Sequence, residues 1–254
     1  MLQSECDCCK SVNFFKLKLK NPFLIDQKLK IDANKITRIK TIFETPLSFI
    51  FLSELNKKKA AVKSFSFNTW SQLKDRKPIE SEFLENEILT YQVIHNYEKN
   101  DSKKCDYLVE YLGFILYDNN HPDIGAIVNS WCSHGNLSNY SKFISNQVKF
   151  FEIEKSWKNK DSIYQNEIVE LLNMALQIAK AMHYLNNTLK IIHRDLKGNN
   201  VFLEMRNDGK LITKVGDFGT CLNETNKSWI NHPSYYGTEG FMVSFSKTGK
   251  LVIT

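Results

Sequence analysis

The sequence has no long apolar run and no sign of a secretory leader. None of its stretches reaches the roughly 18 consecutive apolar residues that predict a membrane-spanning helix. The N-terminal stretch MLQSECDCCKSVNFF contains no basic segment followed by an apolar one, so it does not resemble a signal peptide. Without such a signal, we expect the six cysteines to be free thiols and the chain to be cytoplasmic.

Glycine and proline are also scarce, with 10 and 5 among 254 residues. With 42% hydrophobic and 24% charged residues, the composition is that of a globular protein rather than a collagen-like or low-complexity chain. The net charge of +6 is spread along the chain, so no nucleic-acid partner is expected. The length permits one large domain or two small ones with a core.

The N-terminal cysteines lack the second half of a zinc site. Cys6, Cys8 and Cys9 are clustered, but no other Cys or His follows before His95. Zinc sites in proteins usually combine two such ligand pairs. We therefore expect residues 1–35 to be a leader of uncertain order. A metal-binding module remains an alternative, and it requires stoichiometric zinc that is lost when these cysteines are replaced by serine.

Alternating apolar residues predict strands in the first half of the chain. Three successive antiparallel strands are predicted between residues 36 and 67, and two more at about 106–117 and 124–132. Between them, apolar residues at helical spacing predict a helix at about 78–97. One face of that helix carries Leu84, Glu87, Ile88, Tyr91 and Ile94.

The second half begins with a polar stretch, about 145–165, that is predicted to be a loop. A long helix at 166–187 follows, and its apolar stripe is expected to pack in the core. The stripe consists of Ile168, Leu171, Leu172, Ala175, Ile178, Ala179, Met182 and Leu185. This order of elements predicts an α+β protein with a sheet-rich lobe, a helical lobe and a cleft between them.

Two motifs after the long helix carry the chemistry. HRDLKGNN at residues 193–200 resembles the catalytic loop of protein kinases, H-R-D-L-x-x-x-N, at every defined position. GDFGT at residues 216–220 resembles the D-F-G motif of the same family. Because both motifs occur in the family's order, the resemblance is specific, and it covers about residues 36–242. It points to Ser/Thr kinases of the tyrosine-kinase-like group.

The resemblance implies a two-lobed protein-kinase-like fold. Residues 36–131 would form an N-lobe built on an antiparallel sheet. Residues 132–242 would form an incomplete helical C-lobe with the catalytic loop and the activation segment, and residues 243–254 an atypical tail.

The resemblance also implies roles for the motif residues. Phosphoryl transfer depends mainly on positioning and on neutralising charge. Asp195 would accept the proton of the attacking hydroxyl, and Lys197 would lie beside it, as in Ser/Thr kinases. Asn200 and Asp217 would bind Mg²⁺ at the phosphates of ATP. His193 is expected to be a structural support rather than a base.

Upstream, AAVK resembles the V-A-I-K strand of kinases, which makes Lys63 the candidate for the α- and β-phosphates. Its partner should be a glutamate on the next helix. We favour Glu87 over Glu85, because Glu87 lies on the apolar face of the predicted helix.

The stretch IVNSWCSHGNL resembles the segment that joins the two kinase lobes. Asn129 would be the gatekeeper residue, and Ser130, Trp131 and Cys132 would offer groups to the adenine edge. By the same resemblance, Arg194 would bind a phosphorylated residue of the activation segment. The candidates for that modification are Thr225, Ser228, Ser234 and Tyr235.

The sequence departs from the family at the phosphate-covering loop. The segment FETPLSFI, residues 43–50, stands where the family has G-x-G-x-x-G. Phe43, Thr45 and Ser48 occupy the glycine positions, and Pro46 interrupts the stretch. Glycine lets the backbone approach phosphate closely, so these side chains should weaken nucleotide binding.

A second departure follows GTEGFM at residues 237–242, which resembles the segment before A-P-E in kinases. The chain continues as VSFSKTGKLVIT instead. Without the later elements, the stripe of the long helix and the apolar residues around Ile191 and Val201 should be partly uncovered. Our hypothesis is that translation has entered an intron after Met242; the alternative is a genuine truncated paralogue.

These observations predict a protein Ser/Thr kinase in intracellular signalling that uses ATP and Mg²⁺ and acts on protein substrates. The competing hypothesis is a catalytically impaired pseudokinase or decoy that binds partners without transferring phosphate. The glycine-free loop and the missing A-P-E element favour the competitor, whereas the motif residues favour the enzyme. The sequence leaves the oligomeric state open.

Overall fold

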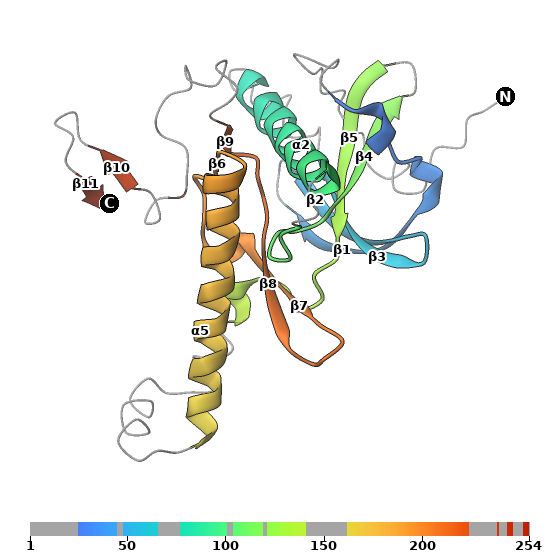
Figure 1. The fold of residues 1–254 in the computed structure, drawn as a ribbon. Helices are drawn as coiled ribbons and strands as arrows, with labels where there is room; N and C mark the ends of the chain where they lie inside the picture. The colour runs from blue at the N-terminus through green and yellow to red at the C-terminus, as the bar shows by residue number, and fades with distance from the viewer. Residues whose placement is uncertain are drawn as a thin grey trace. The chain divides into compact units, whose positions relative to one another are not determined.

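A computed structural model describes residues 25–44, 48–65, 77–100, 104–118, 121–140, 162–223, 238, 243–245 and 251–253. The chain divides into two compact units, which are described separately below (Figure 1). Unit 1 comprises Met1–Lys99 and Glu110–Trp131, and unit 2 comprises Asn100–Val109 and Cys132–Thr254. No helix in the described ranges is long and apolar enough to cross a membrane.

Unit 1 is built on a five-stranded antiparallel sheet with the order β1-β2-β3-β5-β4. The predicted order of three strands, one helix and two strands is confirmed. Helix α2 lies against the sheet (Figure 1). The elements are β1 (Ile36–Glu44), β2 (Ser48–Leu55), β3 (Lys58–Phe65), α2 (Lys77–Asn100), β4 (Tyr111–Asp118) and β5 (His121–Ser130).

The turn between β2 and β3 has a local cause in the sequence. Asn56 and Lys57 both have positive φ, 51° and 66°, and they connect the paired residues Leu55 and Lys58. A two-residue turn with this backbone matches the twist of a hairpin. The hairpin brings β3 beside β2 in a continuous register, and β3 carries Lys63.

Apolar side chains are buried on both faces of the sheet of unit 1. On the face of Lys63, helix α2 contributes the buried residues Ile88, Tyr91 and Ile94, all three on the helix face predicted from the sequence. The cluster within the sheet consists of Ile36, Phe51, Ala60, Val62, Ile115, Ala126 and Val128.

Strand β1 is an irregular edge of this sheet. Its pairing with β2 shifts between Arg38 and Lys40 and again between Thr41 and Phe43. Such bulges bend a strand and discourage pairing with another chain. Phe43, at the first expected glycine position, is 55% exposed. The other departures from glycine at Thr45 and Pro46 lie outside the described residues, and Ser48 begins β2.

The opposite edge, β4, is covered by the segment before β1. Residues 25–35, for which the sequence predicts no definite structure, contain the short 3₁₀ turns η2 (Gln27–Leu29) and η3 (Ala33–Lys35). The backbone N–H of Ile31 donates to Phe114 O at 2.7 Å, and Ile25 is buried. Gly113 permits this approach, because a Cβ there would lie 2.2 Å from Leu29 O.

The described residues of unit 2 form one long helix, short strand pairs and connecting loops. The helix begins at Ser162, four residues before the predicted start and inside the stretch predicted as a loop; residues 145–161 lie outside the described ranges. The remaining elements are η5 (Tyr184–Thr188), β6 (Ile191–Ile192), η6 (Gly198–Asn200), β7 (Val201–Met205), β8 (Leu211–Val215), β9 (Leu222–Asn223), β10 (Val243–Phe245) and β11 (Leu251–Ile253), after α5 (Ser162–His183).

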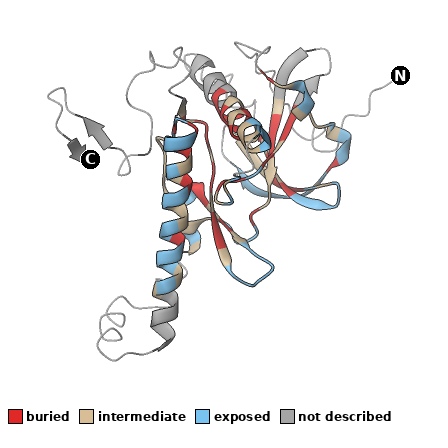
Figure 2. Cartoon of the chain, in the orientation of Figure 1, coloured by how far each residue is buried: buried red, intermediate tan, exposed pale blue. Residues whose placement is uncertain are grey.

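The apolar stripe of the long helix is partly exposed, which confirms the expectation that it is partly uncovered and corrects the expectation that the whole stripe packs in the core. Leu172 is 65% exposed, and the α5 ribbon is largely coloured as exposed (Figure 2). The buried side is centred instead on Met174 and Ala181, next to Gln177, whose Oε1 accepts bonds from the backbone and hydroxyl of Thr213 in β8. The residues of the predicted stripe that are exposed are Leu171, Leu172, Ala175 and Ala179.

The expected exposure around the catalytic motif is also wrong at two positions. Ile191 and Val201 are 0% and 1% exposed, although we expected both to be partly uncovered. Strand β6 pairs with β9, which lies far along the chain, and β7 forms a hairpin with β8. The described part of the chain therefore buries both side chains.

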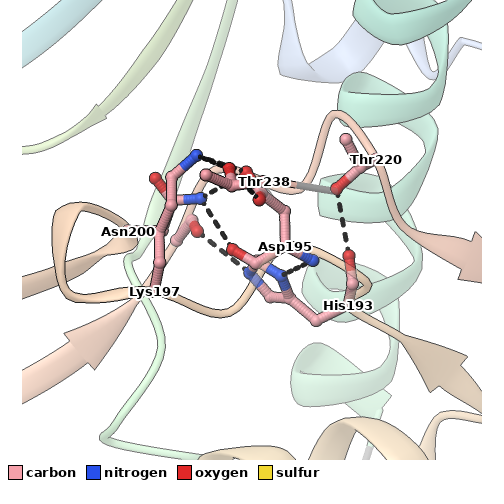
Figure 3. Close-up of polar contacts among 7 residues, drawn as sticks. His193, Asp195, Lys197, Asn200, Thr220 and Thr238 are labelled. Atoms are coloured by element: carbon pink, nitrogen blue, oxygen red, sulfur yellow. Dashed lines mark hydrogen bonds and ion pairs between the residues drawn. The ribbon is translucent and has the colours of Figure 1, made fainter. Parts of the chain in front are cut away.

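His193 supports the loop that follows β6 from within the core of unit 2 (Figure 3). Its Nε2 lies 3.1 Å from Gly216 O, and its Nδ1 accepts the backbone N–H of Asp195 at 3.3 Å. The ring also meets Phe218 edge-on at 5.5 Å. Only the neutral ring with its proton on Nε2 satisfies both bonds. Burial accordingly lowers the pKa of His193, against smaller opposing effects from the Gly216 hydrogen bond and the nearby aspartates.

We predict that Gly113→Ala destabilises the protein and releases the segment before β1. The φ of +144° is unfavourable for alanine, and the new Cβ would clash with Leu29 O. Strain and overpacking together should cost about 3 kcal/mol. Gly209→Ala is the matched control: its φ is +77° but nothing lies within 4 Å, so only about 1 kcal/mol is expected. Urea unfolding measures both, and faster amide exchange at Ile31 reports release. Equal costs would contradict the clash.

A second prediction concerns pH. The folded state lowers the pKa of His193, so the unfolded chain binds this proton more readily. The free energy of unfolding should fall as pH drops below the unfolded value near 6.5, and this histidine should contribute no slope above it. His193→Gln should flatten that part of the curve. An unchanged slope in His193→Gln, measured by urea unfolding between pH 5 and pH 8, contradicts the assignment.

Candidate active site

Within unit 1, β3 and α2 form a buried ion pair. Lys63 Nζ lies 2.8 Å from Glu87 Oε2, and the two side chains are 23% and 3% exposed. The paired glutamate is therefore the one on the apolar face of α2. A carboxylate this deeply buried needs its partner, since an unpaired buried charge is costly. The side chain of Glu85 lies outside the described residues.

A second polar contact joins the same helix to the sheet. Asn129 Nδ2 on β5 donates to the hydroxyl of Tyr91 on α2 at 3.0 Å. Tyr91 in turn stacks on Tyr111 of β4, with ring centroids 4.9 Å apart. Burial raises the pKa of Tyr111, and the charge of Glu87 adds to the effect. The amide of Asn129 is thus engaged with the helix.

The residues expected at the adenine edge lie at the end of β5 and directly after it. Ser130 donates its backbone N–H to Glu110 O at 2.9 Å, and Trp131 is half-buried at the end of unit 1. Cys132 begins the next part of unit 2 and is buried. Burial raises the pKa of its thiol to about 12; Glu204 adds to this shift and Lys214 opposes it. A thiol of this kind is unreactive.

In unit 2, polar side chains converge on the carboxylate of Asp195 (Figure 3). Lys197 Nζ lies 2.8 Å from Oδ2, and Asn200 Nδ2 donates to the same oxygen at 3.0 Å. Thr238 donates its hydroxyl to the other oxygen, Oδ1, at 2.6 Å. Lys197 also donates to Thr238 Oγ1 at 2.6 Å. Both carboxylate oxygens are thus oriented by hydrogen bonds, as a general base requires.

Thr238 is the member of this cluster that the sequence reasoning missed. The motif GTEGFM contains it, but it was used only to locate the end of the activation segment. Its hydroxyl side chain next to a glycine was the available signal. The spacing of residues in the sequence does not predict that Thr238 lies next to Asp195.

The backbone of the loop is bent to present these side chains. Arg194 and Asp217 have φ values of 64° and 62°, which residues with a Cβ rarely adopt. Arg194 Nε donates to Thr220 O at 2.6 Å, and Thr220 Oγ1 donates to His193 O at 3.1 Å. The backbone N–H of Gly216 donates to Asn200 O at 2.9 Å. These bonds join the two motif loops.

Arg194 therefore contacts the main chain just after the D-F-G motif. The residues that we expected it to bind after phosphorylation, at positions 225, 228, 234 and 235, lie outside the described ranges. That expected role stays a prediction.

The oxygen donors near Asp195 suit a magnesium ion. Asn200 Nδ2 donates to both Asp195 O and Oδ2, which fixes the orientation of the amide and leaves Oδ1 as the atom for a cation. Asp217 supplies a carboxylate from the adjoining loop. No cluster of three or more His, Cys, Asp or Glu occurs among the residues that the structure describes. Few protein oxygens, completed by phosphate and water, fit Mg²⁺ better than Zn²⁺ or Ca²⁺.

Residues 73–234 match the family of protein tyrosine and serine/threonine kinases. The chain is 36% identical over 106 residues to the serine/threonine/tyrosine-protein kinase HT1 of Arabidopsis thaliana, covering 41% of this chain and 21% of that protein. It is 38% identical over 86 residues to the human serine/threonine-protein kinase A-Raf, covering 31% and 13%. It is 33% identical over 146 residues to the dual specificity protein kinase zak2 of Dictyostelium discoideum, covering 51% and 20%.

The chain thus spans about a fifth or less of the length of these relatives. The names of these relatives agree with the tyrosine-kinase-like group that the motifs indicate. The family match covers more than half of the chain and includes both motif loops and helix α2. The sheet order of unit 1 and the cluster around Asp195 agree with that match, and the chain belongs to the protein tyrosine and serine/threonine kinase family.

Proposed function

We propose that this chain binds ATP with Mg²⁺ and transfers the γ-phosphoryl group to a Ser or Thr hydroxyl of a protein substrate. The observation that carries the proposal is the arrangement at Asp195. Its Oδ1 already accepts a hydroxyl hydrogen bond from Thr238 at 2.6 Å, which is the contact that a substrate hydroxyl needs. Lys197, next to the same carboxylate, places a positive charge where phosphoryl transfer develops negative charge.

The remaining residues would bind the metal ion, the phosphates or the adenine of ATP. Asn200 and Asp217 would bind Mg²⁺, which neutralises charge on the phosphates when it is present. Lys63, held by Glu87, would bind the α- and β-phosphates. Asn129, Ser130, Trp131 and Cys132 would lie at the adenine edge. In this proposal residues 36–131 act as the N-lobe and 132–242 as the part of the C-lobe that contains the catalytic loop.

A cytoplasmic location is part of the proposal. ATP and Mg²⁺ are supplied there, and the reducing conditions would keep cysteines as thiols. In the described part of the chain, Cys105, Cys132 and Cys221 form no disulfide.

The second candidate function is that of a binding module that transfers no phosphate. The specific observation in its favour is Phe43, a large exposed side chain at the first glycine position of the phosphate-covering loop. Such a side chain hinders close approach of backbone N–H groups to phosphate. The two functions differ in one measurable respect, which is phosphoryl transfer.

We predict that Asp195→Asn abolishes most phosphoryl transfer and leaves nucleotide binding nearly intact. Losing the base should lower the rate by about 10²–10⁴-fold, because general-base catalysis contributes that much. Transfer from radiolabelled ATP to a generic Ser/Thr substrate measures the rate, and Mg²⁺-ATP thermal stabilisation measures binding. Asp208→Asn, at an exposed aspartate in the turn after β7, is the control and should retain full activity.

Stabilisation without transfer in the unaltered chain would identify the binding module. Transfer that survives in Asp195→Asn would show that another group accepts the proton.

We also predict that Lys63→Met weakens Mg²⁺-ATP binding by about tenfold or more, since a charge-assisted contact to phosphate is lost. The variant should also be less stable, because Glu87 stays buried without its partner. Lys59→Met removes an exposed lysine from the same strand and serves as the control. Binding is measured by titration calorimetry below the unfolding temperature. Equal affinities in the two variants would exclude Lys63 from the phosphate site.

A further inference from the structure

One end of the sheet in unit 1 carries a group of lysines without acidic partners. Ile36 at the start of β1 pairs with Leu55 of β2, and Leu55 pairs with Lys58 of β3. The residue before β1 and the exposed turn between β2 and β3 therefore lie at the same end of the sheet (Figure 2). With neighbouring strands about 5 Å apart, the Cα atoms of these lysines lie within roughly 12 Å of one another. The group consists of Lys35, Lys57, Lys58 and Lys59, each exposed and without an ion pair to any described residue.

Strand β1 adds exposed apolar side chains along the same edge. Its pairing with β2 skips Ile39 and Ile42, one at each irregularity, and their side chains are 51% and 42% exposed. Phe43 follows and is also exposed. Lys40 lies between the two isoleucines, is exposed, and has no ion pair in the described part of the chain. Single exposed apolar residues are common, but three within five residues of one edge strand form a patch beside positive charge.

Nearby carboxylates leave this edge with an excess of positive charge. Residues 32–59 contain six lysine and arginine residues but three acidic ones, Asp32, Glu44 and Glu54. Glu54 is the closest to the lysines, because it pairs in register with Lys59, yet these two side chains form no ion pair. Glu44 lies at the far end of β1. Asp32 caps η3, where its Oδ1 accepts the backbone N–H of Asn34.

The type of cation indicates the type of anionic partner. Arg38, the arginine of this region, is already engaged, because its guanidinium lies 4.0 Å from the centre of the Phe51 ring and donates to Thr41 Oγ1 at 2.6 Å. Arginine binds single phosphates through two parallel hydrogen bonds, whereas lysine is a flexible point charge that suits a diffuse anionic surface. Lysine is also depleted in protein–protein interfaces. The exposed lysines therefore favour an extended negative surface over a protein groove.

An anionic membrane surface also accounts for the apolar side chains. Peripheral proteins combine basic residues at the lipid headgroups with apolar residues that enter the boundary between headgroups and acyl chains. A nucleic acid offers negative charge, but aliphatic side chains such as Ile39 and Ile42 gain little from its phosphate backbone. The combination of exposed lysines and exposed isoleucines on one edge therefore favours lipid.

We propose that this edge of unit 1 docks reversibly on a membrane that contains anionic phospholipids. The lysines lie at the headgroups, and the isoleucines enter the boundary beneath them. Such binding weakens as salt rises, because it depends on exposed charges. It goes beyond the proposed kinase function and does not depend on it, since none of these residues binds ATP, metal or substrate in that proposal. The docking surface consists of Lys35, Lys40, Lys57, Lys58 and Lys59 with Ile39 and Ile42.

Co-sedimentation with vesicles tests the charges. Vesicles of phosphatidylcholine with about one third phosphatidylserine should bind the chain, and vesicles of pure phosphatidylcholine should not. Replacing Lys57, Lys58 and Lys59 together by glutamine should lower the partition coefficient on the anionic vesicles about 100-fold, at about fivefold for each lysine. The matched control makes the same change in net charge elsewhere and should stay within about twofold. It replaces the exposed residues Lys99, Lys190 and Lys210 by glutamine.

A second variant tests the apolar contribution. Ile39→Thr combined with Ile42→Thr keeps both side chains β-branched, so the strand is retained while apolar surface is lost. The partition coefficient on the anionic vesicles should fall about tenfold. Circular dichroism and thermal unfolding verify that each variant is folded.

The proposal is overturned if the unaltered chain does not bind the anionic vesicles, or binds pure phosphatidylcholine vesicles equally well. An equal loss in the control variant overturns it as well, because net charge alone would then explain the binding. Unchanged vesicle binding in the isoleucine variant removes the apolar part of the surface and contradicts the proposal. A single-stranded homopolymer RNA is the competing probe. If it binds more tightly than the vesicles and the isoleucine variant binds it equally well, the edge is a nucleic-acid site instead.

Discussion

The candidate active site depends on the hydrogen bonds that join the loop of Asp195 to the loop of Asp217. His193 Nε2 bonds to Gly216 O, and Gly216 N–H bonds to Asn200 O, so each loop supplies both donors and acceptors to the other. These bonds are buried, where leaving a polar group unpaired is costly. They hold the positive φ angle at Asp217, which would otherwise relax. A Cβ at Gly216 would lie 2.8 Å from Val109 Cγ2, which explains the glycine.

Next to this junction, the positive charge of Lys197 lies 2.8 Å from the carboxylate of Asp195. Each carboxylate oxygen of Asp195 accepts a hydrogen bond, one from Lys197 and the other from Thr238. The backbone N–H of Asp195 donates to His193 Nδ1. Donors at both oxygens fix the orientation of the carboxylate, which a base needs. The hydroxyl of Thr238 therefore belongs to the same electrostatic arrangement as the motif residues, although about forty residues of chain separate it from Asp195.

The sequence was most informative where chemistry requires particular side chains in a fixed spacing. HRDLKGNN and GDFGT identified the loop residues, and helical periodicity selected Glu87 as the partner of Lys63. Periodicity failed on α5, because that helix is apolar around much of its circumference, and the position of β8 decides which side is buried. Thr238 and the segment before β1 were not predictable, since both depend on contacts between distant parts of the chain, namely Thr238 Oγ1 with Asp195 Oδ1 and Ile31 N–H with Phe114 O.

Because the phosphate-covering loop has no glycine, the ion pair between Glu87 on α2 and Lys63 is more important for ATP binding in the proposed function. In a loop with glycines, backbone N–H groups hold the phosphates and share that work with the lysine of β3. Here Phe43 stands exposed at the first glycine position, and β1 has irregular pairing on either side of Thr41. In the proposed function, fewer backbone donors would then reach a phosphate, and more of the binding free energy would come from Lys63. Lys63 Nζ lies 2.8 Å from Glu87 Oε2, so in the proposed function the placement of this lysine at the phosphates would depend on that ion pair.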